Sequence, residues 1–97
     1  MNIVYFVPEG RENAIPRAEL RQKTGLNDRE MREMIERARR NGNIILNMQD
    51  GRGYFRPTPD EVNEIEKQYK QNDRRAKSIL VQQKHLRHTL KQAGRQV

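Results

Sequence analysis

The sequence contains no cysteine and no tryptophan, and its only imidazole side chains are those of His85 and His88. Without cysteine, disulfide frameworks, thiol catalysis and cysteine-based zinc sites are all excluded. The two histidines have no carboxylate within one helical turn, which favours solvent-exposed side chains over a metal site. The sequence also has no phosphate-cradling glycine loop, nucleophile elbow or HExxH motif. We therefore expect no catalytic residue, no metal and no cofactor.

Apolar residues are scarce, because Ile, Leu, Val and Phe make up only 20 of the 97 residues. This composition suffices for one small core and does not favour an enclosed pocket for a small-molecule substrate. No apolar run approaches the length of about 18 residues that a membrane span requires. The start at Met1–Val7 lacks the basic segment and the cleavage site of a signal peptide. We expect a soluble, cytoplasmic protein of one domain with an appendage.

Basic residues outnumber acidic ones by 20 to 13, and the resulting net charge of +7 indicates a polyanionic partner. The charge is uneven, because residues 1–57 carry +3 whereas the chain from Lys67 onward carries +8. The composition changes at Pro57-Thr58-Pro59, after which Asp60–Ala93 contains neither glycine nor proline. We therefore divide the chain into a domain at residues 1–57 and an appended segment at residues 58–97.

The first part of the domain contains one apolar run and one helix signal. Residues 3–7 are β-branched, aromatic and apolar, which predicts a short strand or extended segment. Pro16 is suited to the first position of a helix, which we expect over 17–24. Gly25 follows as a natural terminator, because it adopts the left-handed conformation without Cβ strain.

A second helix is expected over 28–40. Asn27 is its N-cap, and Glu30 completes a capping box three residues later. Apolar residues spaced i, i+3, i+4 and i+7 predict one buried stripe, formed by Met31, Met34, Ile35 and Ala38. Two helices joined by a short glycine-containing turn are the outline of a helix-turn-helix.

A β-hairpin is expected directly after these helices. Residues 43–48 and 54–56 are the candidate strands, and Asp50-Gly51 between them is a hairpin signal. Arg52 stands at the tip, whereas we expect the two aromatic residues of the second strand to pack rather than to stack on bases. The predicted fold class is α+β, mainly α: a winged helix-turn-helix with a β-hairpin wing and a long C-terminal helix.

The last segment has a strong helix start, with Thr58 as N-cap, Pro59 at the first position and Glu61 at the third. We expect one helix from there to about Ala93. Its a/d stripe has heptad spacing and consists of Val62, Ile65, Tyr69, Asn72, Ala76, Ile79, Gln83, Leu86, Leu90 and Ala93.

Such a helix is too long to bury its stripe on the domain. At ~1.5 Å per residue it extends about 52 Å, whereas a domain of this size is about 25 Å across. We favour a homodimer over a helix that bends near Asn72-Asp73 and folds back. The expected dimer contacts are Ile79, Leu80, Leu86 and Leu90. The basic side chains of this helix either complement its macrodipole or contact the DNA backbone.

The second helix is the candidate recognition helix for the DNA major groove. Arginine reads guanine through two hydrogen bonds, and an arginine at the wing tip contacts phosphate or the minor groove. The residues expected to contact DNA are Asn27, Arg29, Arg32, Arg37, Arg40 and Arg52. The alternative is a solvated face held by the i,i+4 ion pairs Arg29–Glu33, Arg32–Glu36, Glu33–Arg37 and Glu36–Arg40. For Arg11-Glu12-Asn13 we favour a structural role over a phosphate contact.

Four features together resemble small winged-helix proteins encoded in phages and prophages of Gram-positive bacteria. They are the string Gly10–Pro16 (GRENAIP), the helix-turn-helix after it, the hairpin Asp50–Phe55 and the basic run Arg74–Leu80. The resemblance covers most of the chain. It implies a winged-helix fold, DNA binding and a role as a transcriptional or replication regulator.

We therefore expect a non-enzymatic protein that binds double-stranded DNA and forms a homodimer through its C-terminal helix. The alternative is a protein–protein interaction module of a phage or replication assembly, with the winged domain as scaffold and the helix as docking element. A weak RNA binder is less favoured, because stacking aromatic residues are lacking.

Overall fold

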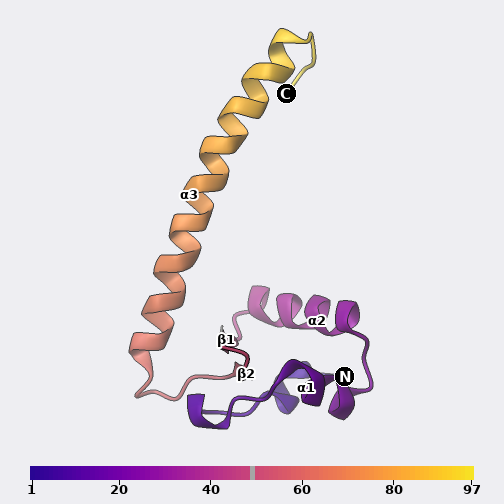
Figure 1. Ribbon diagram of the computed structural model, residues 1–97, viewed down its shortest axis with the longest axis vertical. Coiled ribbons are helices and arrows are strands. Elements are labelled where there is room, and N and C mark those ends of the chain that lie inside the picture. Colours follow the sequence, from indigo (N-terminus) through magenta and orange to yellow (C-terminus); the bar gives the residue numbers. More distant parts are fainter. Residues whose placement is uncertain (49) are drawn as a thin grey trace. The chain divides into compact units, whose positions relative to one another are not determined.

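The computed structural model describes residues 1–48 and 50–97 (Figure 1). Gln49, which falls within the predicted hairpin loop, lies outside the described residues. The chain forms two compact units, Met1–Ile65 and Glu66–Val97. It is mainly helical, with one small antiparallel sheet and a long C-terminal helix, which confirms the predicted mainly helical α+β class.

The segment expected to be a strand at residues 3–7 is instead the 3-10 helix η1 (Ile3–Phe6). The side chain of Asn2 caps it by accepting a hydrogen bond from the N–H of Val4 at 3.0 Å. The helical turn brings Ile3 and Val7 to one buried side and leaves Tyr5 exposed, whereas a strand would place all three on one face. The strand prediction was therefore wrong, because the same apolar run buries its two aliphatic ends more completely as a turn that packs on both following helices.

The next segment also differs from an extended chain. A second 3-10 helix, η2, spans Arg11–Asn13. Two single-residue bridges flank it: Glu9 pairs with Arg56, directly after the second strand of the hairpin, and Ile15 pairs with Tyr54 of that strand. The N-terminal part of the chain thus supplies two short turns and two pairing points.

The two helices of the predicted helix-turn-helix have the expected bounds. Helix α1 spans Arg17–Thr24 and ends at Gly25, which adopts a left-handed conformation with φ 72°. Helix α2 spans Asp28–Arg40. The predicted capping box is present, because the Asn27 side chain accepts from the N–H of Glu30 at 2.8 Å and the Glu30 side chain accepts from the N–H of Asn27 at 3.2 Å.

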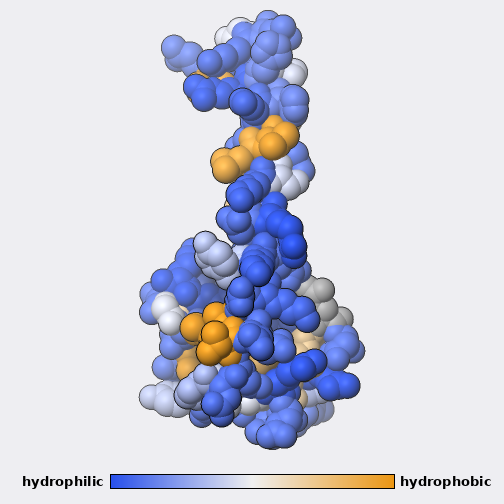
Figure 2. Space-filling view, turned by 90° about the vertical axis from the view of Figure 1, so that its left-hand side faces the viewer, coloured by the Kyte–Doolittle hydropathy of each residue, from blue (hydrophilic) through white to orange (hydrophobic). Residues whose placement is uncertain are grey.

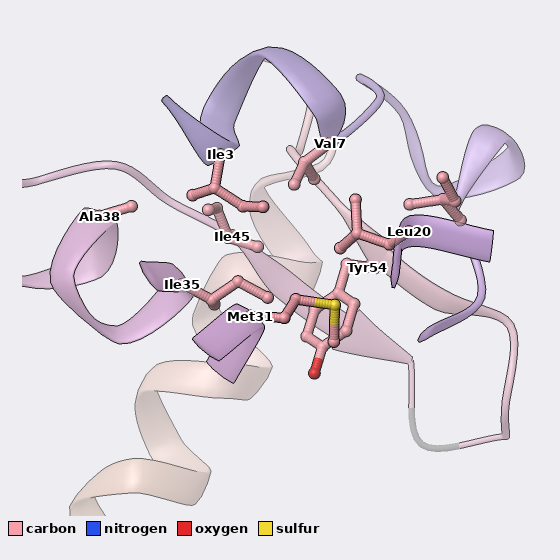
Figure 3. Packing of buried hydrophobic residues seen from close by; sticks show 9 residues of the cluster. Ile3, Val7, Leu20, Met31, Ile35, Ala38, Ile45 and Tyr54 are labelled. Carbon is pink, nitrogen blue, oxygen red and sulfur yellow. The ribbon is translucent and has the colours of Figure 1, made fainter. Parts of the chain in front are cut away.

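One small core joins these elements. In Figure 3 the apolar side chains of η1, α1, α2 and the sheet converge on each other. Of the predicted α2 stripe, Met31, Ile35 and Ala38 are buried and Met34 is half-buried. The core cluster consists of Ile3, Val7, Ile15, Leu20, Met31, Ile35, Ala38, Ile45 and Tyr54.

The hairpin is present but shorter than expected. Strand β1 (Leu46–Met48) pairs antiparallel with β2 (Gly53–Phe55), with Leu46 opposite Phe55. Residues 43–45 are not a strand, because they close the end of α2: Asn43 donates from both its backbone N–H and its side chain to the carbonyl of Ala38. The Arg39 side chain in turn donates to the carbonyl of Ile45 at 3.0 Å.

The other side of β2 is paired as well. Ile15 and Tyr54 exchange two backbone hydrogen bonds of 2.9 and 2.8 Å. Beyond them, Gly10 donates to the carbonyl of Arg56, and Arg56 donates to the carbonyl of Pro8. The sheet itself has two strands, and the chain before α1 contacts the other edge of β2 and the residue after it through isolated bridges.

Helix α3 spans Val62–Gln92 without interruption at Asn72. It begins later than the predicted start at Thr58-Pro59, because Thr58–Glu61 forms a turn in which the Glu61 N–H donates to the Thr58 carbonyl at 3.0 Å. None of its side chains is fully buried. Among the described residues, no helix combines the length and apolar character needed to cross a membrane.

Candidate nucleic-acid interface

The outward face of α2 consists of charged side chains. Its buried stripe fixes which residues point away from the core, since successive helical residues are 100° apart around the axis. All six side chains opposite the stripe are exposed, and they line one open surface depression. Four are basic and two acidic: Arg29, Arg32, Glu33, Glu36, Arg37 and Arg40. The structure therefore brings together four of the six residues predicted to contact DNA.

The ion pairs on this face differ in part from the predicted set. The Arg29–Glu33 pair is present, with 3.2 Å between Nε and Oε1. The predicted Arg32–Glu36 pair was wrong. Instead, Arg32 pairs with Asp28 at 3.2 Å, and Glu36 pairs with Arg39 at 3.0 Å. The guanidinium of Arg39 also donates a hydrogen bond to the carbonyl of Ile45, the residue before β1.

Two arginines remain without a carboxylate partner. Among residues 1–48 and 50–97, no ion pair involves Arg37 or Arg40, so the predicted Glu33–Arg37 and Glu36–Arg40 pairs are not formed. The Arg29–Glu33 pair is exposed, and exposed pairs contribute only about 0–1 kcal/mol, whereas Asp28, the partner of Arg32, is half-buried. A phosphate can therefore replace Glu33 as the partner of Arg29 at little cost.

The N-terminal end of α2 collects further polar groups. The oxygen of the Asn27 side chain is committed to the helix cap, which leaves its amide nitrogen as the group that can face a ligand. Arg17 of α1 lies there too, with its Nε 3.5 Å from Asp28, the carboxylate that also pairs with Arg32. Sequence reasoning missed Arg17, because only the packing of α1 against α2 brings it to this end.

Arg52 lies at the hairpin tip, as predicted. The turn Asp50–Arg52 is held by the N–H of Arg52, which donates to the Asp50 side chain at 3.1 Å. The guanidinium also pairs with Asp50 at 3.2 Å, and the Arg52 side chain remains 70% exposed. Tyr54 and Phe55 behind the tip are buried, which confirms that they pack in the protein rather than offering faces to bases.

The string around Arg11 has a structural role. Its backbone N–H donates to the Glu61 carboxylate at 2.9 Å, and its guanidinium lies 3.5 Å from Glu64. Asn13 donates its side-chain amide to the carbonyl of Glu9. The pKa of Glu61 is lowered because its carboxylate accepts hydrogen bonds from the backbone N–H of Thr58 and then of Arg11. This confirms the structural interpretation of the Arg11-Glu12-Asn13 string.

The predicted dimer residues are all exposed on α3. Ile79 is 50% exposed, Leu80 67%, Leu86 58% and Leu90 41%. His85 and His88 are exposed as expected. In the part of the chain that the structure describes, no group of acidic and imidazole side chains could hold a metal ion.

Comparisons with family models, with curated proteins and with solved structures gave no match.

Proposed function

We propose that the unit Met1–Ile65 is a winged helix-turn-helix domain that binds double-stranded DNA without catalysing a reaction. The observation that carries this proposal is the order α1, Gly25 turn, α2 and antiparallel hairpin around one shared core. The isolated bridge between Ile15 and Tyr54 holds the chain before α1 against β2 and supports the winged form of the motif. In this arrangement α2 is the helix that enters the major groove.

The side chains of α2 have distinct roles in this proposal. Arg37 and Arg40, which have no ion-pair partner among the described residues, contact phosphates directly. Arg29 and Arg32 exchange their carboxylate partners, Glu33 and Asp28, for a base edge or a phosphate. The amide of Asn27 donates from the N-terminal end of the helix, and Arg52 contacts the backbone or minor groove from the wing.

The net charge of the recognition face determines the expected affinity for a random duplex and its dependence on salt. The six side chains of the depression carry four positive and two negative charges, so the face has a net charge of +2. Because Glu33 and Glu36 lie among the arginines, few phosphates are neutralised and the salt dependence of binding is moderate. A random duplex is therefore bound weakly, and sequence-dependent contacts must supply the rest of the affinity.

A fluorescence-anisotropy titration with a labelled duplex at several salt concentrations tests the proposal. Arg40→Ala and Arg52→Ala each weaken binding and reduce the slope of log affinity against log salt by about one. The matched control is Lys23→Ala, which removes the same charge from α1 beside Tyr5 and Glu19, away from the α2 face. Circular dichroism verifies that all three variants are folded.

Unchanged duplex affinity in both arginine variants would remove the proposed interface. The ion pairs Arg29–Glu33 and Arg39–Glu36 favour a second candidate, in which the same face docks on a protein. Absence of duplex binding by the wild-type chain even at low salt is the result that supports this alternative. Single-stranded DNA and RNA serve as competitors, and preference for either contradicts the proposal.

A further inference from the structure

Helix α3 has an a/d stripe on which several large apolar side chains are exposed. Figure 2 shows apolar patches that interrupt its otherwise hydrophilic surface. Val62, Tyr69, Ile79, Leu86 and Leu90 lie on the a/d stripe and are each at least 41% exposed. Because α3 is one straight run of helical residues from Val62 to Gln92, the stripe is continuous and available to a second helix.

We infer that α3 pairs with α3 of a second copy of this chain in an antiparallel coiled coil, in one defined register. This inference goes beyond the proposed DNA binding and does not depend on it. In this register the centre of the pair falls between Lys77 and Ser78. Each a position of one helix then faces a d position of the other, as antiparallel coiled coils require.

The polar residues of the stripe select this register. Asn72 of one copy faces Gln83 of the partner copy, so each polar layer contains two amides that can hydrogen-bond to each other. Every other layer is apolar, and the central one combines small Ala76 with large Ile79. The remaining layers pair Tyr69 with Leu86, Ile65 with Leu90 and Val62 with Ala93.

Charge selects the antiparallel orientation over the parallel one. The beginning of α3 and the turn before it contain the acids Asp60, Glu61, Glu64 and Glu66, whereas the chain from Lys67 onward carries +8. Antiparallel pairing places each acidic end beside the basic end of the partner. Parallel pairing would place the two +8 segments side by side, and like charges at these positions are destabilising.

One flanking pair makes the charge complementarity specific. Glu66 and Arg87 both occupy e positions, and in the antiparallel register they face each other across the helix pair, twice by symmetry. Glu66 contacts Lys70 of its own helix at 3.0 Å, but its side chain is 56% exposed and can also receive Arg87 of the partner copy. In a parallel pair, Glu66 would instead face the like-charged Glu61.

Disulfide trapping tests the orientation and the register of the helix pair together. Because the chain has no native cysteine, only the introduced cysteines can form disulfides. Asn72→Cys and Gln83→Cys variants of the full chain are mixed and oxidised. The antiparallel register predicts the mixed dimer, because positions 72 and 83 face each other across the pair, and little self-linked dimer from either variant alone. Intact mass spectrometry separates the products, since the two variants differ by one methylene. Lys84→Cys, on the outer side of the helix, measures random collision.

Sedimentation equilibrium of the full chain tests association itself. Leu86→Glu raises the dimer dissociation constant by at least about 100-fold, because two buried leucines are lost per dimer. His85→Glu makes the same charge change on the neighbouring residue, outside the stripe, and leaves the dissociation constant within a few-fold of the wild type. A wild-type monomer at high concentration would overturn the inference, and efficient self-linking of Asn72→Cys would overturn its antiparallel form.

Discussion

At the scale of single residues, Gly53 lies where the chain at Ile15 and Pro16 packs directly against strand β2. It is the first residue of β2, it is buried, and its φ is +101°. A Cβ atom built there would overlap the carbonyl group of Ile15 and crowd Pro16, so the approach of the N-terminal segment to β2 requires glycine. Gly51, in the hairpin turn, also has a positive φ of +89° but faces open space.

This contrast gives a stability prediction. Gly53→Ala destabilises the fold by about 3 kcal/mol or more, because backbone strain adds to a clash between backbone atoms. Gly51→Ala carries only the cost of the left-handed conformation, about 1–2 kcal/mol. Urea unfolding followed by circular dichroism measures both variants. Equal losses in the two variants would contradict the close packing of Ile15 on Gly53.

At the scale of secondary-structure elements, the carboxylate of Glu61, the residue before α3, makes two hydrogen bonds within the first unit. One of its oxygens accepts from the N–H of Thr58 at 2.9 Å, and the other accepts from the N–H of Arg11 at 2.9 Å. Arg11 lies far from Glu61 in the sequence, so this side chain fastens the start of α3 to the 3-10 helix η2. The residue directly before α3 thus makes a tertiary contact.

The lowered pKa of Glu61 predicts a pH dependence of stability. The folded state favours the ionised carboxylate, so its contribution is fully present above the unfolded pKa of about 4.3 and is lost as the pH falls through the lower folded value. We expect the free energy of unfolding of the wild type to fall between about pH 6 and about pH 3 more steeply than that of Glu61→Gln. Parallel pH profiles, measured by urea unfolding, would contradict this role.

Elements with local signals were predictable from the sequence. The Asn27–Glu30 capping box and Gly25 fix the ends of α1 and α2 through neighbours a few residues away, and the structure confirms both. The segments 3–7 and 43–45 were not predictable in the same way. Residues 3–7 form a helical turn because they are buried against α1 and α2. Residues 43–45 are not a strand because Asn43 hydrogen-bonds to the end of α2.

The candidate site was predictable as a set of residues but not as a set of contacts. Helical spacing correctly placed Arg29 and Arg40 on the outward face of α2. The partner of Arg32 was missed, because Asp28 and Glu36 are both four residues away and spacing alone cannot choose between them. The position of Arg17 at this site could not be predicted from spacing along one helix, because its contact with Asp28 joins α1 to α2.

At the scale of the whole molecule, the first compact unit extends past the composition change at Pro57. It ends at Ile65 and so includes the first residues of α3. Within this unit Glu61 and Glu64, which follow the composition change, both contact Arg11. The composition change at Pro57 and the end of the compact unit at Ile65 are therefore two different boundaries.

Truncation distinguishes these two boundaries. A fragment of residues 1–65 keeps both glutamate contacts and unfolds cooperatively with a Tm close to that of the first unit in the full chain. A fragment of residues 1–57 lacks both contacts and melts at a lower temperature, because η2 loses its hydrogen-bonding partner. Differential scanning calorimetry compares the two fragments, and equal melting temperatures would show that the domain is complete at Pro57.

The pairing of β2 on both sides also bears on how this small, highly charged protein avoids aggregation. Unpaired strand edges are templates on which other chains add and form fibrils. With β1 on one side and the Pro8–Ile15 segment on the other, the most apolar strand of the described residues has both edges occupied. The outer edge of the sheet then belongs to β1, which is only three residues long and has polar Asn47 at its centre. We therefore expect the folded unit to stay resistant to seeding by strand addition, with aggregation requiring that the N-terminal segment first detach.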